Sequence, residues 1–411
     1  NIFFINTSTM NAMLKELDTE IEAIFPEIVA IRRHIHQHPE LSFQEYKTSA
    51  YIQERLTLLD IPFKVVANTG VVAVLEGEKP SSDDIVVLRA DIDALPIHEQ
   101  NDVLYKSTNE GVMHACGHDF HTANLLGVAT ILKGYKAEFS GKIVLLFQPA
   151  EEKIPGGAIQ ILESGILESF GGKIKAVLGL HVSPRVPLGK IGLRPGRFMA
   201  SSDEFYFTIK GRGGHAAEPH RGVDPIMIAA QLLTTLQQLV SRKANPDIPS
   251  VLTFGRFIGD GAANVIPEEV KLAGTFRTMD ETWRKEALAT VATIARTLPE
   301  ALGATVDVEV RHGYPALNND PKLTQQVKNI LQRSMGNEVV QDLEIWMAAE
   351  DFAYYSYRYP ALFMLVGTNN DQINTQYGLH NPQFNLDEKA FKTAISALVN
   401  SAVSLLNESN G

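Results

Sequence analysis

Nine consecutive residues, 113–121, hold the most concentrated chemistry in the chain. The segment MHACGHDFH contains three histidines, one aspartate and the only cysteine of the 411 residues. Burying such titratable side chains together is energetically costly unless they bind a cation. The segment therefore predicts a metal site, with Cys116 and His118 among its ligands.

The spacing of these residues also predicts their local structure. Cys116 and His118 are two residues apart, so they cannot share a helix face, and we expect them in a loop or at a strand end. The following run, 122–136, has the pattern of a helix. The helix dipole would then favour a thiolate at Cys116. A core cysteine or a thiol-protease nucleophile remains an alternative at this point.

Four apolar segments have the pattern of strands buried on both faces of a parallel sheet. They are residues 85–96, 142–152, 176–182 and 361–368. Each segment carries, or is followed by, acidic or histidine side chains: Asp91 and Asp93, Glu151 and Glu152, His181, and His380. Ligands and catalytic groups of open α/β sheets gather outside the carboxyl ends of the strands. We therefore expect these side chains to meet Cys116 and His118 at one sheet edge.

The expected ligands are one thiolate, one carboxylate and three imidazoles: Cys116, His118, Glu152, His181 and His380. This set is enough for two divalent ions and suits zinc, manganese or a similar metal better than magnesium or calcium. Two such ions could share a water molecule and lower its pKa. Glu151, next to Glu152 but on the other face of the chain, is then the expected general base.

The remaining chain predicts two domains. Helices are expected at 14–35 and 45–59, and a strand at 64–75. His34, His36 and His38 resemble a metal tract, but Pro39 breaks their periodicity, and we interpret them as structural.

Residues 197–315 differ in character from the segments on either side. Strands at 204–210, 251–258, 270–277 and 306–311 alternate with two helices, which predicts an antiparallel sheet with both helices on one face. Asp224 is the expected N-cap of the first helix, with Pro225 at its first position. The predicted fold is α/β: a mostly parallel-sheet catalytic domain, residues 13–196 and 316–411, interrupted by a smaller α+β domain.

Composition and charge restrict the partners. With 37 basic and 48 acidic residues the net charge is −11, which argues against nucleic acid. No apolar run approaches the roughly 18 residues that span a bilayer. A single cysteine forms no intrachain disulfide and suits the cytoplasm. The start of the sequence has no clear secretory signal, and we expect native sequence to begin near Met10 or Met13.

Several motifs resemble the metal-dependent aminoacylase/carboxypeptidase family of amidohydrolases. They are RADIDALPI, MHACGHDFHTA, FQPAEE, GLHV, GRGGHAAEP and AEDFAYY, and they follow the family's order over nearly the whole chain after about Ile31. The nearest branch contains hippurate hydrolases, indole-acetyl-amino-acid hydrolases and N-acyl-amino-acid deacylases. The resemblance implies a two-metal catalytic domain with an inserted lid or dimerisation domain. It also assigns the five expected ligands and the general base Glu151.

The resemblance further implies contacts with the substrate. It assigns His215 to the oxyanion that develops on the scissile carbonyl, and Asn264 and Arg277 to a free carboxylate. Some of these residues reach a neighbouring subunit in the family, so a homodimer or higher homo-oligomer is expected. Asp91 would orient a ligand. Arg89 stands where other branches have a metal-binding histidine, a loss for which Cys116 would compensate.

The expected function is removal of the acyl group from N-acyl-L-amino acids by a metal-bound hydroxide. Dipeptidase or aminopeptidase action at the same di-metal site is the main alternative. A non-catalytic module that binds amino-acid conjugates would have no need of a base beside Glu152. A cysteine nucleophile would predict activity in the presence of a chelator.

Overall fold

The computed structural model describes residues 7–80, 82–373 and 375–408, which form two compact units. The first unit contains the described residues up to Gly196, Asn318–Glu344 and those from Tyr354 onward. The second contains Arg197–Leu317 and Ile345–Ala353. The sequence had placed Ile345–Ala353 with the last catalytic segment. This segment belongs to the second unit because its backbone bonds there, for example from Trp346 N to Phe198 O at 2.8 Å.

The first unit is built on an eight-stranded sheet of order β1-β2-β4-β3-β5-β16-β6-β15. Its strands are β1 Phe63–Val66, β2 Gly70–Glu76, β3 Asp84–Asp91, β4 Lys142–Gln148, β5 Lys173–Pro187, β6 Ile191–Leu193, β15 Val340–Asp342 and β16 Ala361–Asn369. The central strands β4, β3, β5 and β16 pair in parallel with one another, whereas the outer neighbours β2 and β6 pair with β4 and β16 antiparallel. These strands correspond to the four predicted apolar segments, and the prediction of a mostly parallel sheet is confirmed.

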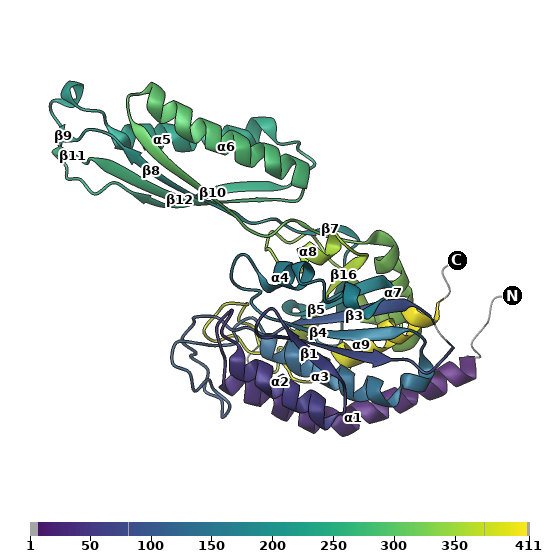
Figure 1. Ribbon diagram of the computed structural model, residues 1–411. Coiled ribbons are helices and arrows are strands. Elements are labelled where there is room, and N and C mark those ends of the chain that lie inside the picture. Colours follow the sequence, from purple (N-terminus) through teal and green to yellow (C-terminus); the bar gives the residue numbers. More distant parts are fainter. Residues whose placement is uncertain (1–6, 81, 374, 409–411) are drawn as a thin grey trace. The chain divides into compact units, whose positions relative to one another are not determined.

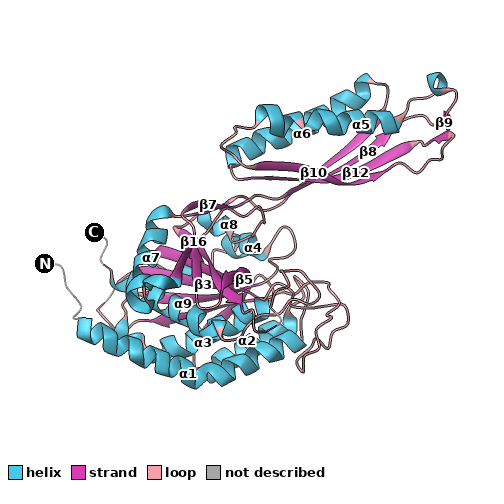
Figure 2. Cartoon of the chain, turned by 180° about the vertical axis from the view of Figure 1, so that it is seen from behind, coloured by secondary structure: helices cyan, strands magenta, loops and turns pink. Residues whose placement is uncertain are grey.

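Helices cover both faces of this sheet (Figures 1 and 2). They are α1 Thr7–Gln37, α2 Tyr46–Leu58, α3 His118–Gly134, α4 Gly157–Glu163, α7 Pro321–Met335 and α9 Ala390–Asn407, with short 3₁₀ turns at Lys136–Glu138, Glu168–Phe170 and Asn337–Val339. Helices α3 and α9 pack against the sheet and against each other, and α1 packs on both. The rings of Phe120 and Phe391 stack between α3 and α9 with their centroids 4.0 Å apart. The apolar core thereby fixes α3, whose first residue is His118.

The predicted strand at 64–75 is wrong in one respect, because the chain folds back within it. Strands β1 and β2 form an antiparallel hairpin in which Val66 pairs with Gly70. Ala67 and Asn68 in the loop have φ angles of 49° and 69°. Two consecutive left-handed residues give a tight reversal that apolar patterning does not reveal.

The second unit has a four-stranded antiparallel sheet of order β10-β12-β8-β13. Its elements are β8 Asp203–Lys210, β9 Gly214–His215, α5 Pro225–Leu236, β10 Ser250–Ile258, β11 Val265–Ile266, β12 Glu269–Thr278, α6 Glu281–Ala301 and β13 Thr305–His312, with a 3₁₀ turn at Pro219–Arg221 and a π turn at Leu239–Lys243. The four-residue helix α8 Ala353–Ser356 begins in the second unit and ends in the first. Helices α5 and α6 cover one face of the sheet (Figure 1). Asp224 caps α5, accepting from the amides of Ile226 and Met227, as predicted.

The chain passes between the units in the short strands β7 Gly196–Met199 and β14 Leu317–Asn319. In the part of the chain that the structure describes, no helix is both long and apolar enough to cross a bilayer.

Candidate metal centre

The carboxyl ends of β3, β4, β5 and β16 lie at one edge of the first unit's sheet, because the four strands are parallel. The loop before α3 brings Cys116 to this edge, and α3 begins at His118. Gly117 between them has a φ of 81°, and a Cβ at this position would lie 2.4 Å from a methyl group of Val182. A glycine is therefore required for Cys116 and His118 to approach β5 together.

Cys116 belongs to two groups of three potential metal ligands. One group adds His118 and His181, and the other adds Glu152 and His380. Within each group the ligand atoms all lie within 4.8 Å of one another. The Sγ of Cys116 is 3.4 Å from Nε2 of His181. The structure thus brings together all five residues that the sequence predicted as ligands, with the thiol common to both groups.

Hydrogen bonds fix which nitrogen of two histidines faces the centre. Nδ1 of His118 lies 2.9 Å from the carbonyl oxygen of Asp93, and Nδ1 of His181 lies 2.7 Å from that of Val182. A carbonyl oxygen only accepts, so both Nδ1 atoms carry a proton, and in the neutral ring each Nε2 is left with a lone pair for a metal. Such an outer partner is typical of metal-binding histidines.

Buried polar atoms at this centre provide a test of whether a cation fits. Nε2 of His118 is buried and has no hydrogen-bond partner among the described residues. Buried polar atoms are nearly always paired, so an unpaired ligand nitrogen at this centre indicates room for an ion. Thiol, imidazole and carboxylate together suit a borderline divalent metal. The residues present therefore fit a metal site.

The surroundings of Cys116 oppose the effect that the sequence predicted for the helix dipole. Burial raises the pKa of the Cys116 thiol well above its usual range, and the charges of Glu152, Glu151 and Asp91 raise it further. Burial alone would lower the pKa of His118, but the charges of Asp91 and neighbouring carboxylates raise it to about 10. Burial of Cys116 and the carboxylates around both side chains therefore favour a bound cation or proton at this centre.

Asp91 reaches the strand that carries the ligand His181 through His121. Nδ1 of His121 donates to Oδ1 of Asp91 at 2.6 Å, and Nε2 accepts from the amide of Val182 at 2.9 Å. Both nitrogens of His121 are therefore occupied. Asp91, which also receives a hydrogen bond from Arg89 at 2.6 Å, holds His121 and through it the backbone beside His181.

Asp93 is the residue that orients His118, whereas the resemblance named only Asp91 as a residue that would orient a ligand. Its carbonyl oxygen accepts from His118, and its Oδ1 lies 3.2 Å from the same nitrogen. Its Oδ2 accepts from the amide of Glu152 at 3.0 Å. The sequence places both Asp91 and Asp93 at the end of β3, but it does not show which of the two turns toward the ligand His118.

Glu151 and Glu152 do not lie on opposite faces of the chain, contrary to expectation. Their carboxylates and Nε2 of His118 form a single group within 4.8 Å. Both residues lie beyond the end of β4, where alternation no longer applies, and the preceding Ala150 has a left-handed φ of 53°. Glu151 is buried, with 6% of its surface exposed.

His380 comes from the loop after β16. Its φ is 65°, and its amide donates to the carbonyl oxygen of Ala115 at 2.8 Å, which ties this loop to the one carrying Cys116. Its Nε2 lies 3.2 Å from Oε1 of Glu152, whose hydrogen bond and charge raise the pKa of His380.

The three expected substrate contacts lie in the second unit, His215 and Asn264 at the two-stranded sheet of β9 and β11 and Arg277 in the four-stranded sheet. His215 in β9 pairs with Val265, and the carbonyl oxygen of Asn264 accepts from the amide of Ala216 at 3.0 Å. Strand β12 begins at Glu269, just after the strand β11 that pairs with β9, and Arg277 lies eight positions further along β12. At the usual rise of a strand this is roughly 26 Å. His215 and Asn264 therefore lie together, whereas Arg277 of the same chain is too distant to contact the same small molecule.

The side chains of His215 and Arg277 suit their expected roles. Nδ1 of His215 accepts from the amide of Ala217 at 3.1 Å, so in a neutral ring Nε2 carries the proton and is a donor. Arg277 is half-buried and donates to the carbonyl oxygen of Met347 at 3.2 Å. Burial lowers the pKa of Arg277, which the charge of Glu204 partly offsets, so a carboxylate ligand would be favourable.

The histidines near the end of α1 agree with a structural interpretation. His36 is buried, with Nδ1 2.8 Å from Asp119 and Nε2 3.0 Å from Glu99. His34 stacks on Tyr51 with ring centroids 4.2 Å apart.

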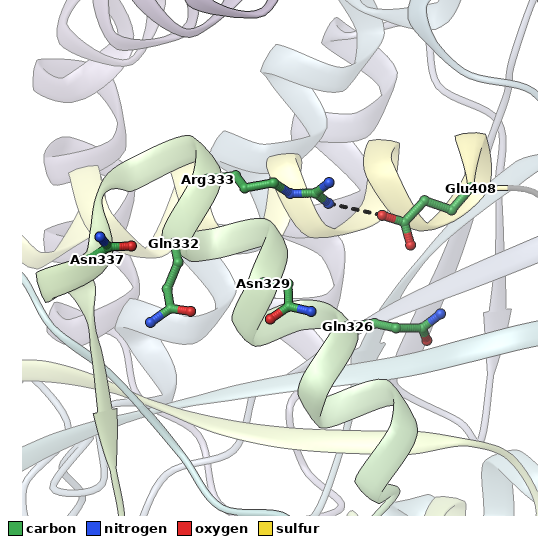
Figure 3. A pocket seen from close by; sticks show the side chains of 6 residues that line it. All are labelled: Gln326, Asn329, Gln332, Arg333, Asn337 and Glu408. Carbon is green, nitrogen blue, oxygen red and sulfur yellow. Dashed lines mark hydrogen bonds and ion pairs between the residues drawn. The ribbon is translucent and has the colours of Figure 1, made fainter. Parts of the chain in front are cut away.

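A separate hollow of about 440 Å³ lies on α7 (Figure 3). Four amide side chains and one ion pair line it: Gln326, Asn329, Gln332, Asn337 and Arg333 with Glu408. This hollow includes none of the residues that the sequence analysis selected.

Comparison with known proteins supports the same chemistry. A model of peptidase family M20/M25/M40 matches residues 87–403. The N-acetyl-L-cysteine deacetylase of Bacillus subtilis is 41% identical over 382 residues, 93% of this chain and 88% of that protein. The N-acyl-L-amino acid amidohydrolase of Geobacillus stearothermophilus is 41% identical over 308 residues, 74% and 82% of the two chains.

A solved structure is similar over nearly the same length. The YXEP protein of Bacillus subtilis, described as a dinuclear metal binding peptidase from the M20 family, superposes with a TM-score of 0.79 at 33% identity, covering 94% of this chain and 99% of that one. The resemblance identified from the motifs is thereby confirmed, and the protein is a hydrolase of amide bonds that belongs to peptidase family M20/M25/M40.

Proposed function

We propose that this hydrolase removes the acyl group from N-acyl-L-amino acids. The observation that carries the proposal is the shared position of Cys116 in two three-ligand groups beside the buried Glu151. The names of two relatives, a deacetylase of N-acetyl-L-cysteine and an N-acyl-L-amino acid amidohydrolase, support this substrate class.

Two divalent ions, which we propose to be zinc or manganese, would be held by the two groups. One would be bound by Cys116, His118 and His181, and the other by Cys116, Glu152 and His380. When bound, such ions supply an acidified water and a polarised carbonyl.

Glu151 is the general base in this proposal. Its carboxylate takes a proton from the attacking water and returns it to the leaving nitrogen. This transfer needs an acidic side chain that is close to the metal ligands but is not itself a ligand. The shared position of Cys116 in two three-ligand groups favours a metal ligand over the alternative of a cysteine nucleophile.

The second unit would recognise the substrate. In our proposal His215 donates to the oxyanion, and Asn264 and Arg277 hold the free carboxylate. Because Arg277 lies in the four-stranded sheet, far along β12 from His215, a complete site would combine residues of two chains.

A homodimer would provide that combination, and β10 is a suitable place for contact. This strand is an edge of the second unit's sheet, and its Val251, Phe257 and Ile258 are exposed. An exposed apolar edge strand is a template for pairing with another chain.

Hydrolysis by metal-stripped protein, with zinc, manganese, cobalt or nothing added back, would test this function. The substrates are N-acetyl, N-benzoyl and N-(indol-3-yl)acetyl amino acids, with unblocked dipeptides as the comparison. We expect cleavage of the acylated compounds only after metal is restored. Preferential cleavage of the dipeptides would instead establish dipeptidase action, and metal uptake without any cleavage would refute the proposed reaction.

A further inference from the structure

Two residues that contact the side chain of Glu45 have backbone conformations that cost energy. Phe43 has a φ of 67° and Ala150 a φ of 53°. A residue with a Cβ in the left-handed region is destabilised by about 1–2 kcal/mol. Ala150 immediately precedes Glu151, so its conformation determines how the chain leaves β4 and where the two glutamates point.

One buried carboxylate binds the amides of both strained residues. Oε1 of Glu45 accepts from the amides of Phe43 and Ala150, each at 2.9 Å, and Oε2 accepts from Oγ1 of Thr69 at 2.7 Å. Glu45 is fully buried and precedes α2 without capping it. Its side chain therefore joins the start of α2 to the turn after β4, 105 residues further along the chain.

The turn is held at three places. The carbonyl oxygen of Ala150 accepts from the amide of Gly157 at 3.0 Å, and the amide of Glu152 donates to Oδ2 of Asp93 at 3.0 Å. Glu45 supplies the third contact at the Ala150 amide. Of these three contacts, only that of Glu45 reaches Ala150 through a side chain. Removing the Glu45 carboxylate leaves the Ala150 amide without an acceptor, so that no hydrogen bond at this amide offsets the cost of the left-handed conformation.

Retaining an acid at this position has an energetic cost. Burial raises the pKa of Glu45, and the charge of Asp93 raises it further, while its hydrogen bonds oppose the shift. An apolar side chain of similar size would carry no such desolvation cost. The benefit of a carboxylate at position 45 therefore lies in the backbone amides that it binds.

We propose that Glu45 is a positioning residue that sets the turn carrying the general base Glu151 and the ligand Glu152. This inference rests on the proposed roles of those two residues. Glu45 acts through the Ala150 amide. This role requires a side chain at position 45 that is long enough to place an acceptor oxygen at that amide.

Three substitutions separate this role from a general contribution to folding. Glu45→Leu removes the acceptor, and we expect kcat and affinity for cobalt each to fall about 10- to 100-fold, as for other partners of metal ligands, with KM nearly unchanged. Glu45→Gln keeps an acceptor oxygen for both amides, and its amide group can donate to Thr69, so it should restore both quantities to near wild type. Adding Ala150→Gly to Glu45→Leu should recover part of the loss, because glycine adopts the left-handed region without strain.

Glu40→Leu is the matched control. The carboxylate of Glu40 also accepts from backbone amides, those of Lys47 and Thr48 at 3.2 and 2.9 Å, but these belong to α2. We expect this variant to lower the melting temperature while kcat and cobalt affinity stay at wild-type values.

Cobalt titration, followed by thiolate-to-cobalt absorption and by the melting temperature, distinguishes the outcomes. A folded Glu45→Leu protein with wild-type kcat and cobalt affinity would overturn the proposal. So would losses in Glu45→Gln equal to those in Glu45→Leu. If Glu45→Leu does not fold, Glu45→Asp decides, since its shorter side chain keeps the charge but cannot reach both amides. Should the wild type cleave no acylated amino acid, the proposed function fails, and cobalt affinity still tests Glu45.

Discussion

The two units hold their candidate residues in opposite ways. In the first unit the side chains of Cys116, His118 and His181 are buried at the end of a parallel sheet, and hydrogen bonds fix both histidine tautomers. In the second unit His215 is exposed in one antiparallel sheet, and Arg277 is half-exposed in another. The first arrangement lies within one chain, whereas in our proposal a substrate or another subunit brings the parts of the second together.

This difference indicates which steps are preorganised. A centre in which two ligand histidines are buried and oriented is ready to bind metal, and in our proposal to activate water, before the substrate arrives. Exposed residues in two separate sheets contribute only once a complex has formed. Variants of the first unit should therefore alter metal binding or kcat, and variants of the second should leave the metals in place.

Glu151→Gln should have the largest effect on turnover. Loss of the general base is expected to lower kcat by about 10²- to 10⁴-fold, while metal content, measured by mass spectrometry, stays as in the wild type. Glu163→Gln, which changes an exposed acid of α4 in the same way, should keep full activity. Activity of Glu151→Gln within tenfold of the wild type would remove Glu151 from its role.

A pair of histidine variants tests the comparison directly. His181→Asn should lose bound metal, because it removes one member of a three-ligand group. His215→Asn should retain both ions and lower kcat by about 10²- to 10³-fold, as expected when an oxyanion donor is lost. Metal analysis and kinetics on both proteins are required. Equal metal content in the two variants would show that the contrast between the units is mistaken.

Arg277→Met should have a smaller effect that depends on the substrate. Loss of a charge-assisted hydrogen bond to the free carboxylate is expected to lower kcat/KM about 10- to 100-fold for an N-acyl amino acid. The corresponding methyl ester should be cleaved equally by variant and wild type. Arg311→Met on β13, which removes an exposed cation packed on Tyr206, should change neither. Equal losses for the acid and the ester would exclude carboxylate binding by Arg277.

Much of the fold could be predicted from sequence because burial leaves a periodic trace. The four central strands are apolar on both faces, and their parallel pairing follows from that pattern. The same rule predicted that Cys116, Glu152 and His181 would converge. The hairpin after β1 was missed because it depends on left-handed φ angles at Ala67 and Asn68, which leave no periodic trace.

The orienting residues could not be predicted for a related reason. Asp91 and Asp93 are both buried at the end of β3, and only the structure shows that Asp93 holds His118 while Asp91 holds His121. Glu45 is a further case, since its bond to Ala150 joins segments 105 residues apart. Side-chain direction at a strand end depends on local backbone turns that composition and spacing do not encode.

The smallest predicted effect concerns the stability of the first unit and distinguishes two histidines that the sequence treated alike. Burial alone would lower the pKa of His36, but the charge of Asp119 and hydrogen bonds to Asp119 and Glu99 raise it above its unfolded value, against the opposing charge of Arg32. Stability from protonated His36 is then fully present below about pH 6.5 and is lost as pH rises through the folded pKa.

His34 provides the matched control with the opposite sign. Burial, followed by the charge of His38, lowers the pKa of His34, so its contribution is lost as pH falls. Urea unfolding between pH 5.5 and 8.5 should therefore show that His36→Gln destabilises most at the acidic end, whereas the cost of His34→Gln grows toward the alkaline end. Parallel pH profiles for the two variants would mean that the carboxylates around His36 do not hold it protonated, and that its burial between them rests on packing alone.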